Sequence, residues 1–508
     1  MSTRTAALGG MAIALTAAAI AYTLGDTYID RLPDHRGIYL VDAANRASGA
    51  PARRPRHTVL VLIDGLRRDA AQGMASMQRL AGAGRCGPTD TGTLTVSRPV
   101  YSLISSGVEA DRSGVRNNDE TRPAPVESIW EVARGAGLQV RGYSGLPWWR
   151  ELFPAGFDDY QVELDRGVDL FARAELADLT LIHVLHVDDA GHDFGADSGG
   201  YRAAVARADR ELGGFLERLD LDRDLIVVTA DHGHSAAGGH GGAAPEIARV
   251  QTCWAGVGVN AGPVPLLDAR AIAPTLAVLL GLPFPRHMRA VDEDLDRIWT
   301  LVGTDQANAA ARRADLERVR AANRDRLGRW LGSDQGTWDQ LYQRERSRQR
   351  ALMLITASLV FIALGLSLWR RRLRWGQAAA STVWMAGVVV ACGVAFALAR
   401  GSFDFTSINL RSEFVRASLS ICIGVGAAGG ILHLALWRDP RRLLADLSSV
   451  LIAVVVLDAA HPLIYGWPMG FPLPHPVLLF WPFFAAPLTL GLAAIAGLTA
   501  AVLAARGR

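Results

Sequence analysis

Polar residues suited to acid–base and metal chemistry gather at four places between residues 64 and 240. They occur in the phrases VLVLIDGLRRD, TVSRPVYSLISSG, HVDDAGH and VVTADHGHSAAGGHGG, where we expect strands to end and polar loops to begin. The candidate residues are Asp64, Ser97, Asp188, His192, Asp231, His232 and His240. Carboxylates and imidazoles mixed in this way suit zinc-like ions. The pattern predicts two adjacent divalent-metal sites and a hydroxyl nucleophile between them.

The same phrases resemble the alkaline phosphatase superfamily. The sequences Asp-Gly-Leu-Arg, Ser-Arg-Pro and Asp-His-Gly followed by Gly-His-Gly have counterparts in one branch of it. That branch holds the type I phosphodiesterases/nucleotide pyrophosphatases and the glycosylphosphatidylinositol ethanolamine phosphate transferases. Each motif alone is a weak signal, but four motifs in the family's order and spacing are a strong one. The resemblance covers roughly residues 55–290.

The resemblance implies a division of the ligands between two ions, expected to be Zn²⁺. Asp64, Asp231 and His232 resemble the ligands of the ion that binds the nucleophile Ser97. A second ion is expected to be held by Asp188, His192 and His240. Two such ions can clamp the attacking and leaving oxygens of an in-line displacement at phosphorus.

The nucleophile is expected to be Ser97, with Thr95 as the competitor. In the family the nucleophile stands ten positions before a turn glycine and often two before a proline, and Ser97 satisfies both through Gly107 and Pro99. Thr95 has in its favour that threonine is the commoner nucleophile in this branch. A purely structural role for Ser97 would be to cap the helix that follows it.

Other polar residues near these motifs have open roles. Asn118 stands where phosphodiesterase relatives carry an asparagine that donates to a phosphoryl oxygen, although Asn117-Asn118-Asp119 would also form a turn. We expect His183, His186 and His234 to form hydrogen bonds around the ligands rather than to bind metal directly.

The elements that would position these residues follow an α/β pattern. The apolar runs 58–63, 180–187 and 225–230 read as buried parallel strands, and 69–83, 126–136, 200–219 and 271–283 read as helices. This predicts an alkaline phosphatase-like α/β sandwich with a mostly parallel sheet. Functional residues are then expected at the carboxyl ends of the strands.

The hydrophobic content of 50% is high for a soluble enzyme of 508 residues. The excess lies in residues 7–24, 351–369, 377–399, 417–437, 447–465 and 476–504, each close to the ~20 residues that cross a bilayer. We therefore predict an integral membrane protein with six spans, although residues 7–24 could instead be a cleaved signal peptide. In the fifth span, Asp458 and His461 are spaced to share a face, as a structural pair or a lipid-headgroup site.

The placement of arginines predicts the orientation. Arg4, the run 370–374 and the run 438–442 fall on one side, which the positive-inside rule assigns to the cytoplasm. We expect a multi-pass protein of the cytoplasmic membrane with residues 25–350 outside the cytoplasm. The predicted parts are an N-terminal transmembrane helix (1–24), a catalytic domain (25–300), a charged helical connector (301–350) and a five-helix transmembrane domain (351–508).

Cysteines and net charge give weaker signals. Cys86 and Cys253 in the catalytic domain are expected to be buried free thiols, with a disulfide as the alternative. The net charge of +3 says little about partners, and no part of the sequence resembles a nucleic-acid-binding patch, so we expect no nucleic-acid partner.

Together these features predict a membrane-bound two-metal phosphoryl-transfer enzyme. Five C-terminal spans exceed what an anchor needs, which favours transfer of phosphoethanolamine or a related phosphodiester group from a membrane lipid to an extracytoplasmic acceptor. A phosphodiesterase or pyrophosphatase, with water as the acceptor, is the alternative. A transport or scaffold protein with an inactive domain is a third reading, and the complete ligand set argues against it.

Overall fold

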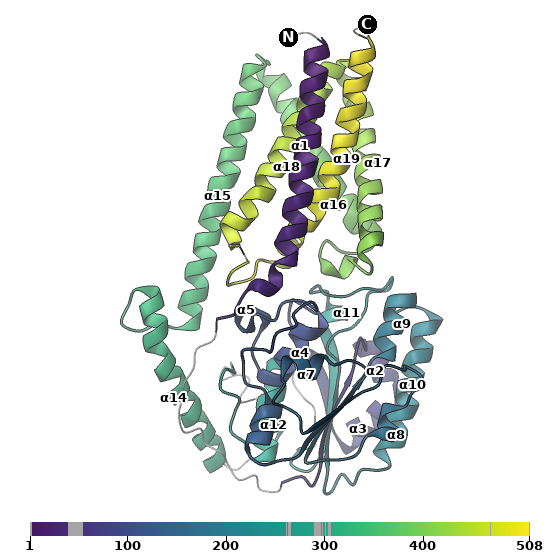
Figure 1. Cartoon of the computed structure of the whole chain (residues 1–508), viewed down its shortest axis with the longest axis vertical. Coiled ribbons are helices and arrows are strands. Elements are labelled where there is room, and N and C mark those ends of the chain that lie inside the picture. The colour runs from purple at the N-terminus through teal and green to yellow at the C-terminus, as the bar shows by residue number, and fades with distance from the viewer. Residues whose placement is uncertain are drawn as a thin grey trace. The chain divides into compact units, whose positions relative to one another are not determined.

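The computed structural model divides the chain into two compact units, each described by itself (Figure 1). One unit comprises Met1–Asp34 and Tyr342–Arg508, and the other comprises His35–Leu341. The structure describes residues 3–38, 54–260, 262, 266–288, 296, 298–299, 301–302, 306–467 and 469–506.

The second unit contains an eight-stranded sheet in the order β4-β3-β5-β1-β6-β7-β2-β8. Its strands are β1 (Thr58–Ile63), β2 (Gly84–Asp90), β3 (Val140–Ser144), β4 (Asp159–Val162), β5 (Leu179–Val184), β6 (Leu225–Thr229), β7 (Arg249–Gly256) and β8 (Leu267–Asp268). Of the pairs between these strands, only β7 with β6 and β7 with β2 are antiparallel. The expectation of a mostly parallel sheet is confirmed.

Helices cover both faces of this sheet (Figure 1). One face packs against α2 (Arg68–Gly73), α3 (Ala75–Ala83), α8 (Leu170–Arg173), α9 (His186–Phe194) and α10 (Gly199–Leu216). The other packs against α4 (Ser97–Ser106), α6 (Ile129–Gly135), α7 (Trp148–Leu152) and α12 (Ile272–Leu280). Alternate residues of β1 enter the two cores, because successive side chains of a strand point to opposite faces.

The short elements of this unit lie in its loops. They are α5 (Ala110–Ser113), α11 (Pro245–Ala248) and the 3₁₀ turn η2 (Ala269–Ala271). The helix expected over 69–83 is broken at Met74, whose backbone is extended. The strand expected over 180–187 ends at Val184, so Asp188 lies in the first turns of α9 rather than in a loop.

Cys86 and Cys253 form a disulfide, so the expectation of free thiols is wrong. The cause is strand register: β2 and β7 are antiparallel neighbours, and Cys86 lies directly opposite Cys253, with a Cα–Cα distance of 4.0 Å. The two residues are far apart in the sequence, and only the pairing of these strands brings them together.

The first unit is helical, and its described residues include six helices long and apolar enough to cross a membrane. They are α1 (Thr3–Asp30), α15 (Trp338–Arg370), α16 (Trp375–Arg400), α17 (Arg411–Trp437), α18 (Pro440–Tyr465) and α19 (Pro476–Arg506). The short turns η1 (Leu32–Asp34) and η3 (Phe405–Ser407) accompany them. This pattern is that of a multi-pass membrane protein.

The segment expected to connect the two parts is divided between two helices. Helix α14 (Gln306–Leu331) belongs to the sheet-containing unit, whereas residues 338–350 are the first turns of the spanning helix α15. The expected boundary at residue 300 lies outside the described residues.

Asp458 and His461 are both buried on α18. His461 Nε2 lies 2.8 Å from the carbonyl oxygen of Leu478 at the start of α19. That oxygen lacks its usual helical donor because residue 482 is a proline and has no N–H. His461 therefore completes the hydrogen bonding of a proline-interrupted helix.

Candidate metal and phosphoryl-transfer site

The candidate site lies at the carboxyl ends of three adjacent strands. In the sheet, β1 lies between β5 and β6 and runs parallel to both. Asp64 follows β1, Asp231 follows β6, and Asp188 lies on the helix that follows β5. Side chains from distant parts of the sequence therefore converge at one edge, as open parallel sheets require.

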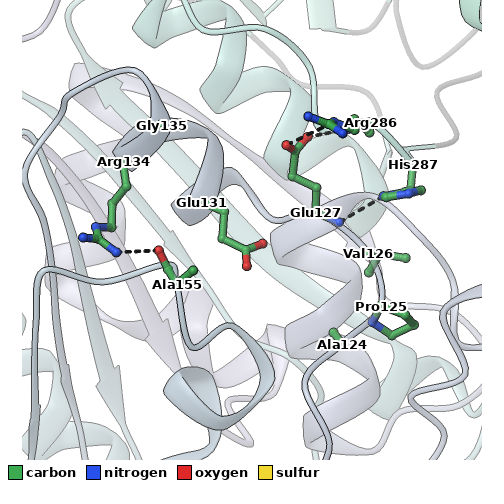
Figure 2. A pocket seen from close by; sticks show the side chains of 10 residues that line it. All are labelled: Ala124, Pro125, Val126, Glu127, Glu131, Arg134, Gly135, Ala155, Arg286 and His287. Atoms are coloured by element: carbon green, nitrogen blue, oxygen red, sulfur yellow. Dashed lines mark hydrogen bonds and ion pairs between the residues drawn. The ribbon is translucent and has the colours of Figure 1, made fainter. Parts of the chain in front are cut away.

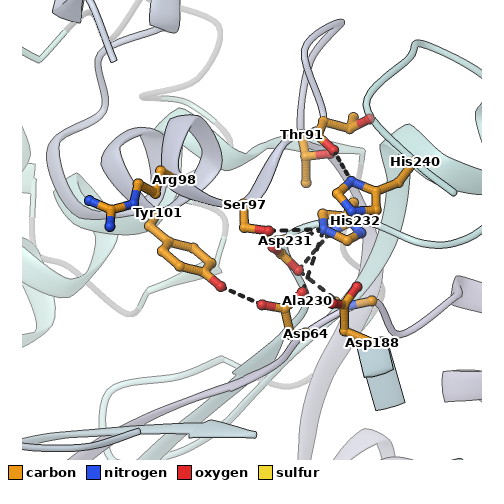
Figure 3. A network of polar contacts seen from close by, with 12 residues as sticks. Asp64, Thr91, Ser97, Arg98, Tyr101, Asp188, Ala230, Asp231, His232 and His240 are labelled. Carbon is orange, nitrogen blue, oxygen red and sulfur yellow. Dashed lines mark hydrogen bonds and ion pairs between the residues drawn. The ribbon is translucent and has the colours of Figure 1, made fainter. Parts of the chain in front are cut away.

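The innermost group consists of Asp64, Asp231 and His232 (Figure 3). His232 Nε2 lies 3.5 Å from Asp64 Oδ1 and 3.2 Å from Asp231 Oδ2. Both of these carboxylate oxygens are buried and accept no hydrogen bond from the described residues. The remaining oxygen of Asp231 accepts from the backbone N–H groups of Gly65 and His232. Each carboxylate is thus held by one oxygen and presents the other to the site.

The protonation of His232 makes this group a set of three acceptors. His232 Nδ1 lies 3.2 Å from the carbonyl oxygen of Gly233, which can only accept, so Nδ1 carries the proton. Burial lowers the pKa of His232 to about 4, so the ring is neutral at pH 7. Nε2 therefore presents a lone pair toward the two carboxylates. Three electron-rich atoms facing one another, without a donor between them, fit a bound cation.

The pKa values of the two buried carboxyls shift in opposite directions. Burial, followed by the charges of Asp64 and Asp188, raises the pKa of Asp231 well above its usual value. Burial also acts to raise the pKa of Asp64, but the hydrogen bond from His183 and the neighbouring histidines outweigh it and the pKa falls. Crowded buried carboxylates of this kind are stabilised by a metal cation.

A buried hydrogen-bond network holds Asp64 in place. Its Oδ2 accepts from the Tyr101 hydroxyl and lies 3.0 Å from His183 Nε2. On the far side of that ring, His183 Nδ1 lies 3.1 Å from the Trp149 indole N–H, which can only donate. The Nδ1 atom is therefore the acceptor, and Nε2 carries the proton that it donates to Asp64. The Ser144 hydroxyl also contacts Nδ1, at 2.8 Å.

The expected hydrogen-bonding role of His183 agrees with this geometry, whereas the contributions of Tyr101 and Trp149 were not predicted. Tyr101 is one helical turn after Ser97 on α4 and so faces the same way, a spacing that could have identified it. Trp149 stacks on the Tyr101 ring at 4.4 Å between centroids, and no pattern in the sequence indicates that contact.

The second group contains Asp188, His192 and His234. Asp188 Oδ1 lies 2.7 Å from His234 Nε2, and Asp188 Oδ2 lies 3.6 Å from His192 Nε2. We expected His234 to stand behind the ligands, whereas it reaches Asp188 more closely than His192 does. Glycine is needed at Gly191, because a Cβ there would come within 2.3 Å of the His234 ring.

His240 joins the two groups. Its Nε2 lies 3.2 Å from His192 Nε2, and its ring stacks on His232 with centroids 3.6 Å apart. Burial and the neighbouring His232 lower the pKa of His240 well below its usual value. His240 Nδ1 lies 2.8 Å from the carbonyl oxygen of Thr95, so this atom donates and Nε2 presents its lone pair to the site.

Ser97 is the first residue of α4 and faces the innermost group (Figure 3). Its Oγ lies 3.4 Å from His232 Nε2. The helix has Val96 at its N-cap and no side-chain cap, so the Ser97 hydroxyl does not have the capping role considered from the sequence. The positive end of the helix dipole favours an anion at this position.

Thr95 has a different environment. Its hydroxyl donates to the carbonyl of Gly242 at 2.7 Å and accepts from the N–H of Gly241 at 3.0 Å. With the contact from His240 to its carbonyl, Thr95 fastens the loop that carries His240. Both hydrogen-bonding functions of its hydroxyl are used by the backbone of this loop.

Asn118 is oriented by the residue that follows Ser97. Its Oδ1 accepts from the Arg98 N–H at 3.0 Å, which uses the acceptor end of the amide. The turn considered from the sequence is made by Asn117, whose Oδ1 accepts from the N–H of Asp119. The turn is therefore made by Asn117, and the expected contact of the Asn118 amide with a phosphoryl oxygen stays a prediction.

Two other features lie apart from this site. His186 lines a small pocket with Arg166 and Glu211, and none of the candidate metal ligands lines that pocket. Burial lowers the pKa of His186 to about 4. A wider pocket of about 690 Å³ is lined by residues 124–127, 131, 134–135, 155 and 286–287 (Figure 2). Its Glu127 pairs with Arg286 at 3.5 Å, and it contains no residue of the candidate site.

Comparison with known proteins gives matches to part of the chain. The family model of type I phosphodiesterase/nucleotide pyrophosphatase matches residues 146–246. GPI ethanolamine phosphate transferase 3, catalytic subunit, of Mus musculus is 26% identical over 276 residues, which cover 46% of this chain and 25% of the mouse protein. GPI ethanolamine phosphate transferase 2, catalytic subunit, of Homo sapiens is 26% identical over 263 residues, 45% of this chain and 26% of the human protein.

Among solved structures, murine ectonucleotide pyrophosphatase/phosphodiesterase 5 matches with 15% identity and a TM-score of 0.41, over 46% of this chain and 98% of that one. The chain matches about a quarter of the length of the transferases named above. The resemblance predicted from the four motifs is confirmed: the chain is similar to the type I phosphodiesterase/nucleotide pyrophosphatase family and to the GPI ethanolamine phosphate transferases.

Proposed function

We propose that this protein is a membrane-bound phosphotransferase that moves a phosphoethanolamine group from a membrane lipid to an acceptor hydroxyl. The observation that carries the proposal is the position of Ser97 at a helix N-terminus, with His232 Nε2 3.4 Å from its hydroxyl and two unbonded carboxylate oxygens beyond it. A hydroxyl in such surroundings is an activated nucleophile for a phosphodiester.

The side chains fit two divalent ions, for which we propose zinc. Asp64, Asp231 and His232 would hold one ion beside Ser97, and Asp188, His192 and His240, with His234, would hold the other. When bound, such ions favour deprotonation of a nearby hydroxyl and offset negative charge on phosphoryl oxygens. Oxygen and nitrogen donors with no cysteine are compatible with zinc and with other divalent ions of the first transition row.

The chain's own residues perform the group transfer. Ser97 Oγ attacks the phosphorus of phosphatidylethanolamine and loses its proton, while the bond from phosphorus to the diacylglycerol oxygen breaks and that oxygen takes up a proton. Phosphoethanolamine is then esterified to Ser97. An acceptor hydroxyl attacks the same phosphorus, and Ser97 recovers its proton. Asn118, held by Arg98, directs its amide N–H toward the phosphoryl oxygen and stabilises the charge that develops there.

Two features favour a lipid donor over a soluble phosphodiester. The two similar mammalian proteins carry the name of ethanolamine phosphate transferases, and the chain supplies six helices that can cross a membrane. Hydrolysis of a phosphodiester or pyrophosphate is the second candidate, because residues 146–246 match a family that includes such enzymes.

The proposed location is the cytoplasmic membrane, with the catalytic unit outside the cytoplasm. The arginine-rich ends of the spanning helices support this orientation. The disulfide between Cys86 and Cys253 gives independent support, because disulfides persist in oxidising compartments.

The test is to reconstitute the purified protein in vesicles that contain phosphatidylethanolamine labelled in its headgroup. Transfer predicts a burst of diacylglycerol stoichiometric with protein, and mass spectrometry should find the phosphoethanolamine mass on the Ser97 peptide. The Ser97→Ala protein should lose turnover by several orders of magnitude, and Thr95→Ala far less. Continuous release of free phosphoethanolamine without acceptor would establish hydrolysis, and the added mass on Thr95 would overturn the choice of nucleophile.

A further inference from the structure

The helical unit contains an apolar pocket of about 160 Å³ between α1, α17 and α19. Its apolar wall includes Phe414, Val415, Phe483, Ala486 and Leu490. Tyr22 and Gly25 line the side formed by α1, where the carbonyl oxygen of Pro482 lies so close that a Cβ at Gly25 would come within 2.6 Å of it. The absence of a side chain at Gly25 allows α1 to approach α19 at this point.

One end of this pocket carries a pair of opposite charges. Arg411 forms an ion pair with Asp26, and both residues line the pocket. The two side chains are 64% and 33% exposed, so each charge can contact a further group. The rest of the lining is largely apolar, so charge is concentrated at one end.

The charged end is where the helices begin or end. Arg411 is the first residue of α17, Asp26 is close to the last residue of α1, and the apolar wall continues along α19 as far as Leu490. Because a helix rises 1.5 Å per residue, the wall from Pro482 to Leu490 extends about 12 Å. A polar rim at the helix ends above an apolar wall of that length matches the polarity of a phospholipid at a membrane surface.

Two backbone features add polarity at the same place. Helix α17 has Leu410 at its N-cap without a side-chain cap, so its first N–H groups favour an anion near Arg411. Pro487 lacks an N–H, so the carbonyl oxygen of Phe483, another residue that lines the pocket, lacks its usual helical donor.

We infer that this pocket binds phosphatidylethanolamine and is the docking site of the donor lipid, an inference that rests on the proposed function. The phosphate pairs with Arg411, the ammonium group pairs with Asp26, and an acyl chain lies along the apolar wall. Charge complementarity selects a zwitterionic headgroup: an anionic lipid without the ammonium would leave the Asp26 carboxylate facing its phosphate. Asp26 lies near the C-terminal end of α1, which ends at Asp30, and the catalytic unit follows in the sequence from His35.

The experiment uses phosphatidylethanolamine with a diazirine in its acyl chain, photolysed with the full-length protein in nanodiscs. The label should map to the peptides that contain residues 411–415 and 482–490. Unlabelled phosphatidylethanolamine should compete at least about tenfold better than phosphatidylglycerol, as expected for one charge-assisted contact. Labelling confined to other helices, or equal competition by the two lipids, would overturn the inference.

Two single variants predict different competition profiles. Asp26→Asn should abolish the preference for phosphatidylethanolamine over phosphatidylglycerol, because only the ammonium contact is lost. Arg411→Gln should weaken the binding of both lipids about tenfold, because both carry the phosphate. Arg416→Gln, an exposed charge on the same helix, is the matched control and should change neither. If Asp26→Asn and Arg411→Gln each change the binding of both lipids equally, the ion pair is only structural and the inference fails.

Blocking the apolar wall provides an independent variant. Ala486→Phe should reduce photolabelling at least about tenfold, whereas Leu498→Phe, at an exposed position further along α19, should leave it unchanged. Labelling does not require chemistry, so the Ser97→Ala protein should label as the wild type does. Specific labelling without phosphoethanolamine transfer would contradict the proposed function alone, whereas transfer without labelling of this pocket would contradict the docking site alone.

Discussion

Two buried clusters of charged and polar side chains, one in each unit, differ in how their hydrogen bonds are satisfied. In the helical unit, Asp446 accepts from Arg371 at 2.5 Å, from Ser381 at 3.0 Å and from His433 at 2.9 Å. In the catalytic unit, Asp64 and Asp231 each have one buried oxygen that accepts from none of the described residues, and His232 turns a lone pair toward both oxygens.

We propose that this difference separates a structural cluster from the candidate functional one. Asp446 on α18 accepts from Ser381 on α16, from His433 on α17 and from Arg371, the residue that follows α15, so these contacts link the four helices. The acceptors around His232 are held in a mutually repulsive arrangement by contacts behind them. A folded protein keeps such an arrangement where a ligand completes it. Residue type alone does not distinguish the two clusters, since both combine aspartate with histidine.

The strongest test of this comparison is removal of one unsatisfied carboxylate. Asp231→Ala should abolish binding of the ion beside Ser97 and with it turnover, because the remaining ligands cannot replace the lost oxygen. Elemental analysis and turnover are the measurements. Asp197→Ala, an exposed carboxylate of the same unit, is the control and should retain metal and activity. Active wild-type protein free of metal would refute the assignment.

Removal of the satisfied carboxylate should instead affect stability. Asp446→Leu leaves the buried His433 and the partly buried Arg371 without their anion and should cost about 3 kcal/mol of unfolding free energy. Asp446→Asn keeps an acceptor oxygen and should cost less. Unfolding in detergent, followed by circular dichroism, measures the loss, and the metal content of the folded fraction should be unchanged. An unaltered unfolding midpoint in Asp446→Leu would show that the cluster is not a structural tie.

The disulfide should stabilise the catalytic unit without affecting its metal site. Replacing Cys86 and Cys253 by serine together should cost about 2–4 kcal/mol. The residues lie on β2 and β7, whereas the candidate ligands follow β1, β5 and β6, so zinc affinity should stay within about twofold of the wild type. A large loss of zinc affinity with little loss of stability would indicate that the strand pairing positions the site.

The sequence was sufficient for the features that are local. Asp64 and Asp231 directly follow continuous apolar runs, and such runs form the buried strands β1 and β6, so their convergence could be predicted. The six spanning helices are equally local, because each is an uninterrupted apolar stretch. The apolar run 180–187 passes from β5 into α9 without a change of composition, so the pattern does not show that Asp188 lies on a helix.

Features that depend on packing between distant segments could not be predicted. Pairing of Cys86 with Cys253 requires the antiparallel register of β2 and β7, which hydrophobic patterning does not specify. The close approach of His234 to Asp188 requires glycine at Gly191, and only the packing of α9 reveals that requirement. The network behind Asp64 requires Trp149 to reach His183 from a separate helix.

The smallest expected effect concerns that network, and it tests whether the acceptors of the metal site are held from behind. Tyr101→Phe removes the hydroxyl that donates to Asp64 while retaining the ring that stacks on Trp149, and should weaken zinc binding about tenfold. Trp149→Phe retains an aromatic ring but removes the N–H that donates to His183 Nδ1 and so keeps the imidazole proton on Nε2. Its effect on affinity should be smaller, because the Ser144 hydroxyl still contacts Nδ1.

Zinc affinity is measured by competition with a chelating indicator on the full-length protein. Tyr143→Phe is the matched control, since its hydroxyl accepts from the N–H of Glu175 instead of contacting Asp64. The ranking of affinity losses should be Tyr101→Phe, then Trp149→Phe, then Tyr143→Phe with essentially none. Because the hydroxyl and the imidazole both donate to the same oxygen of Asp64, they leave its other oxygen to face His232. An equal affinity for zinc in all three variants would mean that Asp64 is held without this network.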